Sequence, residues 1–219
     1  MAKSNIPAKG AIVQRDRETF QIAPHIPGGF VEPALLRKID DVAEKYGAKF
    51  VKLTGTQRMI IIGLQEEDLD AVWAEFEDSS KAIGLTIRSI QMCPGIRSCK
   101  RAKQDSPGLG FALDEEFYGK PAPAKFKMAV SGCPNCCTDP WMRDLGFIGT
   151  DDGFKAVVGG KGGGTPTLAR ELTDGLTEEQ AVALARQVIT FYRENGQALE
   201  RLGATIERVG FDAFKDSVL

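Results

Sequence analysis

The sequence predicts an α+β protein made of two successive parts, and three observations lead to this prediction. Over the first ninety residues, patterns typical of short strands alternate with patterns typical of amphipathic helices. After Met92 this alternation gives way to cysteine-bearing loops and glycine-rich turns. From Thr177 to the C-terminus, the apolar residues mostly follow a helical spacing.

The first part is expected to contain two helices and four strands. The first helix begins at Pro33, which suits an initial helical position, and ends at Gly47. The element order is strand, helix, strand, strand, helix, strand, which is the ferredoxin-like split motif. That fold serves many functions, so it predicts none by itself. The expected elements are strands at 19–23, 49–54, 58–64 and 85–92 and helices at 33–47 and 66–82.

Residues 85–219 are expected to form a second, mixed α/β domain after a ferredoxin-like half at residues 1–84. A cysteine-bearing loop leads into a short helix, and a loop-rich stretch at 105–123 follows it. Thr177 and Gln180 form a capping-box pattern at the start of the helical C-terminal segment. Further strands are expected at 124–132, 146–150 and 154–160, the last two as a pair.

Composition and charge exclude several classes of function. The 219 residues, 42% of them hydrophobic, can bury a sizeable core. The 28 basic and 30 acidic residues nearly balance, which argues against general nucleic-acid binding. The longest apolar runs, such as residues 59–64, are too short to cross a membrane, and the N-terminus lacks the apolar core of a signal peptide. We therefore expect a cytoplasmic protein whose cysteines act as ligands or reactive thiols.

Four of the five cysteines form two pairs with distinctive spacing. Cys93 and Cys99 make a C-x5-C pair, and Cys133 and Cys137 make a C-x3-C pair. Cys136 offers a competing C-x2-C pair with Cys133. The spacing permits a 4Fe–4S cluster, a zinc site or free thiols. The wide first pair, with Pro-Gly after its first cysteine, favours the cluster because zinc sites usually use tighter pairs.

The residues around these cysteines resemble the siroheme- and 4Fe–4S-containing sulfite and nitrite reductases. "CPGIRSC" followed by "SGCPNCC" is similar to the cysteine signature of that family. The resemblance covers nearly the whole chain. It implies six-electron reduction of sulfite to sulfide, or of nitrite to ammonia, with an electron-donor protein such as a ferredoxin supplying the electrons. The similar segments also include residues 53–63, 123–128, 157–163 and 206–215.

The resemblance implies a role for each cysteine. Cys93, Cys99, Cys133 and Cys137 would bind the 4Fe–4S cluster, and Cys137 would also bridge it to the siroheme iron. A shared thiolate would couple the two cofactors electronically. Cys136 would be a small residue beside the cluster that does not bind it.

Two lysines and several polar residues are the expected contacts for anions. Lys125 and Lys127 share one face of a strand, while Phe126 points to the other. A solvated strand face is the simpler interpretation, whereas the resemblance implies contact with substrate or siroheme carboxylates, and a lysine can also deliver protons. The resemblance further implies cofactor contacts from Thr54, Thr56, Gln57, Arg58, Gly160 and Lys161.

Arg88 and His25 complete the expected substrate contacts. Arg88 loosely matches an arginine that the family places before its first cysteine. His25 stands where similar enzymes often have an arginine, in the segment "HIPGG". Because a histidine is only partly charged near pH 7, we expect it to bind an anion more weakly. Exposed surface positions are the simpler interpretation of both residues.

Family enzymes usually contain two such modules, and this chain has one. Lys127 precedes Cys133 by six residues, or about 20 Å along a strand at roughly 3.3 Å per residue. Cluster cysteines and distal lysines of one module would therefore serve different sites. This distance suggests a homodimer in which each site borrows the partner's lysines. The alternatives are a monomer with an open distal face, an electron-transfer or siroheme-carrying subunit without turnover, and a zinc-binding structural protein.

Overall fold

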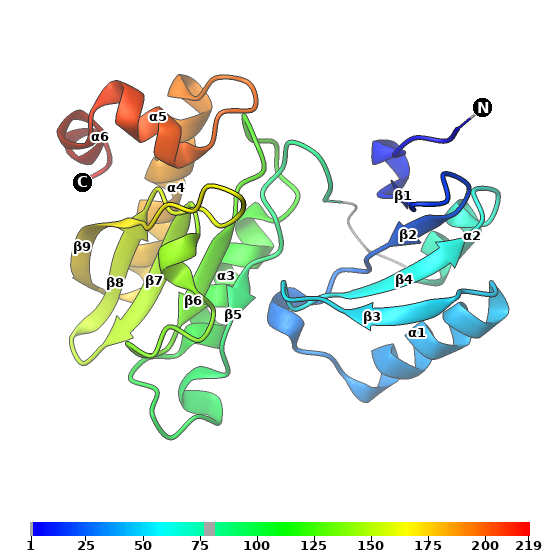
Figure 1. Ribbon diagram of the computed structural model, residues 1–219. Helices are drawn as coiled ribbons and strands as arrows, with labels where there is room; N and C mark the ends of the chain where they lie inside the picture. The colour runs from blue at the N-terminus through cyan, green and yellow to red at the C-terminus, as the bar shows by residue number, and fades with distance from the viewer. Residues whose placement is uncertain (1, 77–81) are drawn as a thin grey trace. The chain divides into compact units, whose positions relative to one another are not determined.

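The structure is a computed structural model that describes residues 2–76 and 82–219 (Figure 1). Its backbone contacts divide the chain into two compact units, Met1–Ile83 and Gly84–Leu219. Each unit has its own hydrophobic core and contains both helices and strands. The predicted α+β class is therefore confirmed. Among the described residues, every helix is too short or too polar to cross a lipid bilayer.

The N-terminal unit is built on a four-stranded antiparallel sheet in the order β1-β2-β4-β3. β4 lies inside the sheet, and its residues from Ile60 onward are buried because neighbouring strands pair with both of its edges. The predicted strands at 19–23, 49–54 and 58–64 and the first helix are confirmed. The elements are β1 (Ile12–Val13), β2 (Phe20–Ile22), β3 (Phe50–Leu53), β4 (Met59–Leu64), α1 (Pro33–Lys45), α2 (Leu69–Glu75) and the 3-10 turns η1 (Pro7–Lys9) and η2 (Pro27–Gly29).

The strand predicted at 85–92 was assigned to the wrong sheet. Only Gln91–Met92 forms a strand, β5, and it pairs with β6 of the C-terminal unit. In the N-terminal sheet, β1 is the edge strand beside β2. Three apolar residues of 85–92 do point into a core, because Ile87, Ile90 and Met92 are buried in the C-terminal unit, whereas Leu85 is exposed. A local pattern reports burial but does not say which sheet supplies the partner.

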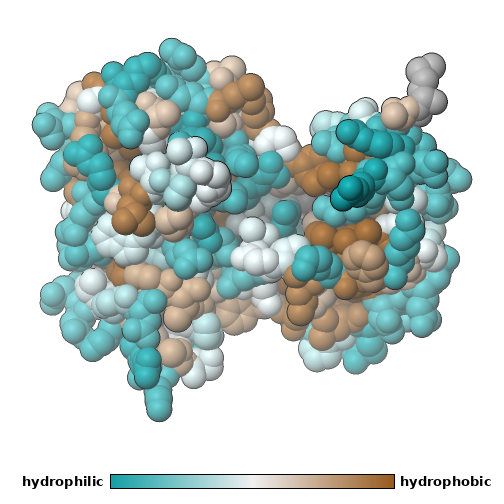
Figure 2. Space-filling model, in the orientation of Figure 1, coloured by the Kyte–Doolittle hydropathy of each residue, from teal (hydrophilic) through white to brown (hydrophobic). Residues whose placement is uncertain are grey.

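The second predicted helix, at 66–82, is shorter in the structure. α2 ends at Glu75, and residues 77–81 of the prediction lie outside the described residues. The indole Nε1 of Trp73, a residue of α2, donates a hydrogen bond to the carbonyl of Lys9, 2.6 Å away. Figure 2 shows hydrophobic side chains gathered on the surface of this unit over β3, where Phe50 is 55% and Leu53 is 71% exposed.

The C-terminal unit is built on a five-stranded mixed sheet in the order β5-β6-β7-β8-β9. The first three strands run parallel, and β8 and β9 continue the sheet antiparallel. The predicted pair at 146–150 and 154–160 is confirmed as β7 and β8, whereas β9 was not predicted. The elements are β6 (Met128–Ser131), β7 (Leu145–Thr150), β8 (Gly153–Val158), β9 (Arg170–Leu176), α3 (Ser106–Phe117), α4 (Glu178–Asn195), α5 (Leu202–Val209), α6 (Phe211–Val218) and the 3-10 turns η3 (Gly95–Arg97) and η4 (Pro140–Met142).

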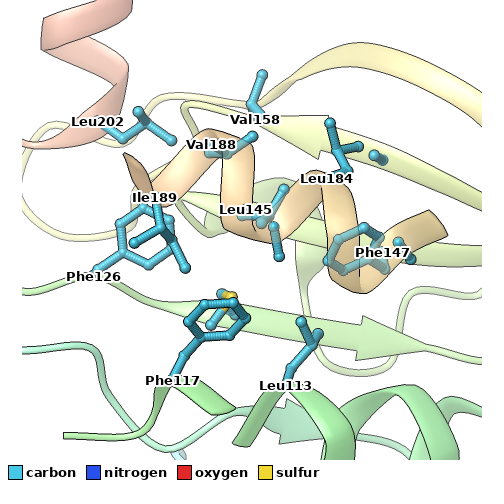
Figure 3. Packing of buried hydrophobic residues seen from close by; sticks show 14 of the residues in the cluster. Leu113, Phe117, Phe126, Leu145, Phe147, Val158, Leu184, Val188, Ile189 and Leu202 are labelled. Carbon is cyan, nitrogen blue, oxygen red and sulfur yellow. The ribbon is translucent and has the colours of Figure 1, made fainter. Parts of the chain in front are cut away.

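Helices α3 and α4 pack against this sheet and enclose the core (Figure 3). Leu184 and Val188 of α4 lie against strand residues such as Leu145, while Leu113 and Phe117 come from α3. The predicted capping box is confirmed, since the Thr177 hydroxyl accepts the Gln180 N–H and the Gln180 side chain accepts the Thr177 N–H. A reciprocal cap of this kind satisfies two backbone donors at the helix start.

The expectation that 105–123 is loop-rich was wrong, because α3 occupies Ser106–Phe117. Gly108 and Gly110 lower the helix propensity of this segment, which hid the helix in the sequence. Tertiary packing requires at least one of them. A Cβ on Gly110 would lie 2.7 Å from the sulfur of Met92 and 2.9 Å from its Cβ, so any larger residue would require Met92 to shift.

Candidate functional site

The first and third cysteines of the predicted cluster lie side by side. β5 and β6 are parallel neighbours, so the residues that follow them emerge at the same edge of the sheet. Cys93 follows β5, and Cys133 comes two residues after the end of β6. The Cys93 N–H donates to the carbonyl of Val130 at 3.2 Å, and the Gly132 N–H lies 3.1 Å from the Cys93 sulfur.

A serine that sequence reasoning missed also contacts Cys93. The Ser106 hydroxyl lies 3.1 Å from the Cys93 sulfur and donates to the Cys93 carbonyl at 2.9 Å. Ser106 is fully buried at the start of α3. Hydrogen-bond donors around a ligating sulfur tune the potential of an iron–sulfur cluster. The only sequence sign of this residue was the Ser-Pro pair that begins the unpredicted helix.

The two cysteine loops approach each other through glycines. A Cβ on Gly132 would lie 3.1 Å from the Gly95 Cα and 2.9 Å from the Gln104 carbonyl. Gly95 itself has φ of 56°, a conformation that favours glycine, and its carbonyl accepts the Cys99 N–H at 2.9 Å. Cys99 is half-buried. The packing of Gly95 on Gly132 thus brings both predicted pairs of ligands to one edge of the sheet.

Cys136 and Cys137 have different surroundings. The Cys136 side chain packs, together with Trp141, against a small apolar cluster of Ile148, Val157 and Ala169. Its backbone is left-handed, with φ of 51°, and burial raises the pKa of its thiol. Cys137 is exposed, whereas Cys133 is buried. These positions agree with the expectation that Cys137 is a ligand and Cys136 is not, and that assignment stays a prediction.

The donor set fits a multi-iron cluster. Within residues 2–76 and 82–219, no three His, Cys, Asp or Glu side chains converge on one metal-ion position. A four-iron cluster binds each cysteine through a different iron, so its ligands stay spread around it. The four predicted cluster thiols lie on two adjoining loops. Those thiols are Cys93, Cys99, Cys133 and Cys137.

The predicted cationic residues share one face of the C-terminal unit. Ile87 and Phe126 form a parallel bridge, and both are fully buried in the core. Neighbours of a buried residue on an extended chain point the other way, so Arg88, Lys125 and Lys127 lie on the opposite face. The Arg88 N–H donates to the Phe126 carbonyl at 2.8 Å, and its guanidinium donates to the Gly84 carbonyl at 2.7 Å. Lys125 is exposed and Lys127 is half-buried.

Lys127 stands near Lys125 and near three charged residues that sequence reasoning missed, Arg143, Asp144 and Arg201. Burial lowers its pKa, and the nearby cations Arg143, Lys125 and Arg201 lower it further, while Asp144 acts in the opposite direction. We call Lys125, Lys127, Arg143 and Arg201 the basic cluster. No motif joins these residues, because they come from three segments of the chain that only the fold brings together.

Asp144 holds the backbone of Lys127 in place. Its carboxylate accepts the Lys127 N–H at 2.8 Å, and its own N–H donates to the Lys127 carbonyl at 3.0 Å. Arg201 donates two hydrogen bonds to the same carboxylate, at 2.9 and 2.6 Å. Burial raises the pKa of Asp144, and the ion pair with Arg201 opposes that effect by favouring the charged carboxylate.

In the N-terminal unit, the predicted polar residues form a tight turn. The Thr54 hydroxyl accepts the Arg58 N–H at 3.2 Å and lies 3.0 Å from both the Arg58 carbonyl and the Thr56 hydroxyl. Gln57 occupies the left-handed region, with φ of 58°. Thr54 therefore shapes the turn, which presents Thr56, Gln57 and Arg58.

The segment that contains His25 packs directly against this turn. A Cβ on Gly29 would lie 3.0 Å from the Cβ of Gln57. Both segments line one open hollow of about 460 Å³, and the half-buried His25 directly precedes Ile26 in its wall. The residues that line it are Ile26, Gly28, Gly29, Val31, Leu53, Thr54, Gln57, Arg58 and Met59.

Gly160 and Lys161 lie in a turn beside Arg143. A Cβ on Gly160 would lie 2.3 Å from the Trp141 carbonyl and 3.0 Å from the Arg143 nitrogen. Glycine is thus required at position 160 because the chain's own backbone approaches it closely. The sequence resemblance implies a cofactor contact at this position. The backbone groups of Lys161 and Thr167 exchange two hydrogen bonds of 2.9 Å.

Known protein families match both units. The family model described as "Nitrite and sulphite reductase 4Fe-4S domain" matches residues 83–219. A second one, described as "Nitrite/Sulfite reductase ferredoxin-like half domain", matches residues 12–79. Together these ranges account for nearly all of the chain.

Individual relatives differ in how much of their length the chain spans. An assimilatory-type sulfite reductase of Nitratidesulfovibrio vulgaris is 37% identical over 96% of this chain and 97% of its own length. An NAD(P)H nitrite reductase of Bacillus subtilis is 40% identical over 91% of this chain but only 25% of its own length. The crystal structure of a dissimilatory sulfite reductase I superposes with a TM-score of 0.83 at 17% identity, covering 91% of this chain and 69% of that one. That superposition supports the fold.

Proposed function

Because this chain belongs to the nitrite and sulfite reductase family, we propose that it reduces sulfite to sulfide. Its family membership confirms the resemblance seen in the sequence, and its cofactors are a 4Fe–4S cluster and siroheme. The observation that carries the proposal is the packing of the two cysteine loops at one edge of the sheet. That edge lies in the same unit as the basic cluster. When bound, the cofactors supply the route by which six electrons reach the substrate.

The cysteines have distinct parts in this proposal. Cys93, Cys99, Cys133 and Cys137 would hold the cluster, and Cys137 would also contact the siroheme. Exposure of Cys137 supports this role, because a thiol that serves a second group has to be accessible from outside its own loop. Cys136 would shield the cluster with the apolar residues around it.

The basic residues would bind the anion and supply protons. Sulfite loses three oxygens as water, which consumes six protons and six electrons and leaves sulfide. Fixed cations favour the negatively charged substrate, and a lysine with a lowered pKa releases its proton more readily than an exposed one. We assign substrate contact to Lys125, Lys127 and Arg88. Cofactor and substrate contacts in the other unit would come from Thr56, Gln57, Arg58 and His25, with Thr54 shaping their turn.

Nitrite is the second candidate substrate. It is also a small anion whose reduction takes six electrons, and relatives of this chain include both sulfite and nitrite reductases. The chain spans 97% of the length of a relative that is named a sulfite reductase. It spans only 25% of the length of the Bacillus nitrite reductase. Sulfite is therefore the favoured substrate.

The proposal extends to partners and location. A separate electron-donor protein, such as a ferredoxin, would supply the electrons. A homodimer would let the lysines of one chain complete the site of the other. We also propose a cytoplasmic location, because a reducing compartment keeps cysteines available as cluster ligands.

The test is a visible spectrum followed by turnover. The purified protein should show siroheme absorption with stoichiometric iron and acid-labile sulfide. It should then produce sulfide from sulfite with a reduced viologen dye as the electron source, and parallel assays with nitrite would rank the two substrates. A colourless protein that contains zinc would reject the proposal. A protein that carries both cofactors but turns over neither anion would instead be a carrier subunit.

A further inference from the structure

The basic cluster holds more positive charge than its own carboxylates balance. It contains Lys125, Lys127, Arg143 and Arg201, and the two acidic residues coupled to it are Asp139 and Asp144. Asp144 is already saturated by Arg201 and by the backbone of Lys127. Asp139 is 71% exposed and lies 3.8 Å from the Arg143 guanidinium, beyond hydrogen-bond distance. Part of the cluster thus lacks a close counter-charge among the described residues.

The side chain of Arg143 makes few hydrogen bonds although it is largely buried. Its side chain is only 12% exposed, yet its one hydrogen bond in the described part of the chain goes from Nη1 to the Met142 carbonyl at 3.2 Å. Its Nε is buried and has no hydrogen-bond partner within the described residues. A guanidinium carries five N–H donors, and a buried donor without a partner is costly. Burial also lowers the pKa of Arg143.

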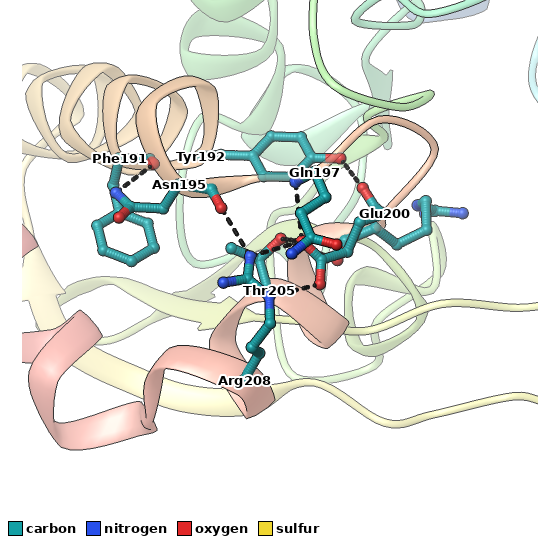
Figure 4. A network of polar contacts seen from close by, with 8 residues as sticks. Phe191, Tyr192, Asn195, Gln197, Glu200, Thr205 and Arg208 are labelled. Atoms are coloured by element: carbon teal, nitrogen blue, oxygen red, sulfur yellow. Dashed lines mark hydrogen bonds and ion pairs between the residues drawn. The ribbon is translucent and has the colours of Figure 1, made fainter.

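The residues next to Arg143 are fixed by buried ion pairs and hydrogen bonds. Asp144, the next residue, is fully buried and clamped by Arg201. Arg201 follows Glu200, whose carboxylate accepts hydrogen bonds from Arg208, Thr205 and the Gln197 backbone (Figure 4). Those contacts lower the pKa of Glu200 to about 2, so it stays charged and fixes the loop that presents Arg201.

We propose that Arg143 and Lys127 together bind one oxyanion. The planar guanidinium of Arg143 donates hydrogen bonds to it through its free N–H groups. This inference rests on the proposed function, and it adds Arg143 to the residues that meet sulfite or a siroheme carboxylate. Both are oxyanions, and guanidinium favours them because its donors match two oxygens at once. Binding gives the remaining Nη N–H groups of Arg143 a charged acceptor and neutralises the excess charge beside Lys127. A lysine at this position supplies charge without the matched pair of donors.

The experiment compares holoenzymes of the wild type, Arg143→Met, Arg143→Lys and Arg186→Gln. Arg186 is the matched control, an exposed arginine of α4 that is paired with Glu116. Two quantities are measured for each protein: siroheme per chain after extraction, and the dissociation constant for sulfite from a titration of the visible spectrum. Circular dichroism checks the fold. If Arg143→Met does not fold, Arg143→Lys provides the comparison, since it keeps the positive charge and removes only the paired N–H donors of the guanidinium.

The two sources of the anion give different results. If Arg143 binds sulfite, siroheme content stays at the wild-type level and the dissociation constant rises roughly tenfold to a hundredfold in Arg143→Met, as expected for a lost charged hydrogen bond. If it binds a siroheme carboxylate, siroheme content falls instead. Folded variants that match Arg186→Gln in both quantities overturn the inference. A wild-type protein without siroheme or sulfite turnover rejects the proposed function itself, whatever the variants do.

Discussion

At the scale of single residues, the sequence identified the reactive groups but not their surroundings. Lys127 was predicted from strand alternation, and the structure adds Arg143, Arg201 and Asp144 around it. These neighbours change its chemistry, because repulsion between cations and burial both disfavour the charged lysine. Cys136 and Cys137 are adjacent in sequence and equally reactive on paper. The resemblance gave them different roles, and the structure adds that Cys136 lies against apolar side chains while Cys137 is exposed.

Replacing Lys127 should stabilise the fold while weakening function. Its pKa is lower in the folded chain than the ordinary 10.5, so at neutral pH the unfolded chain binds this proton more tightly. The charged lysine therefore costs the folded state free energy at pH 7, and that cost disappears as the pH rises through the ordinary pKa. We expect Lys127→Met to raise the urea midpoint of the cofactor-free chain at pH 7, with the difference shrinking toward pH 11. Lys125→Met, at an exposed position, is the control.

The same substitution should weaken sulfite binding by the holoenzyme. If Lys127→Met lowers the urea midpoint at pH 7, or if its stabilising effect grows with pH, then the folded chain does not disfavour the charged form of Lys127. Sulfite affinity equal to that of wild type would remove Lys127 from the anion site.

Serine substitutions should separate the two neighbouring cysteines. Cys136→Ser is expected to keep iron, acid-labile sulfide and siroheme at wild-type levels, because its side chain packs with Trp141 on apolar residues and is predicted not to be a ligand. Cys137→Ser is expected to lose the coupling between cluster and siroheme, which the visible and electron paramagnetic resonance spectra of the reduced protein would report. The reverse pattern would exchange the roles of the two residues.

At the scale of elements, tertiary packing overrode local propensity. α3 contains two glycines and was not predicted, yet it runs for three turns beside β5 and β6. The strand prediction at 85–92 had the opposite fault, since its apolar spacing was right and its sheet was wrong. Both errors concern the same place, where Gly110 packs on Met92 at the end of β5 and just before Cys93.

Gly110 should resist replacement although alanine favours helices. A Cβ there would lie 2.7 Å from Met92 Sδ and Cε and 2.9 Å from Met92 Cβ, and Met92 is only 1% exposed. We expect Gly110→Ala to destabilise the chain by about 1–3 kcal/mol in urea unfolding, which outweighs a helix-propensity gain of about 1 kcal/mol. Gly108→Ala is the matched control in the same helix, because the atoms nearest to its Cβ would be the carboxyl groups of the side chains of Glu178 and Asp105. If the two variants are equally stable, the Met92 side chain moves aside at little cost and the prediction is wrong.

At the scale of the whole molecule, the chain divides its candidate contacts between two units. The turn at 54–58 and His25 belong to the N-terminal unit, and the cysteines and basic cluster belong to the C-terminal one. Within the C-terminal unit, the cysteines follow the carboxyl ends of β5 and β6, whereas Lys127 directly precedes β6. Because these groups stand at opposite ends of one strand, we infer that they serve different sites, and this separation motivates the homodimer.

Complementation between two inactive chains would test the homodimer. Lys127→Ala and Cys137→Ala chains are each expected to be inactive alone, since one lacks the lysine and the other the bridging thiol. Co-expressed and paired at random, they should regain about a quarter of wild-type activity, because half of the dimers would contain one intact site. Wild-type chains mixed with either variant provide the control for expression. No regained activity in the mixed sample would favour a site within one chain.

The sequence by itself determined the α+β class, most of the N-terminal elements, the capping box of α4 and the family through its two cysteine pairs. Those features depend on neighbours in the chain, on regular spacing or on short motifs, which a sequence displays directly. Tertiary structure decided which sheet takes β5, that a glycine-containing segment forms α3, and that Arg143, Asp144 and Arg201 gather around Lys127. These outcomes depend on contacts between residues far apart in the chain, whose energies no local pattern contains.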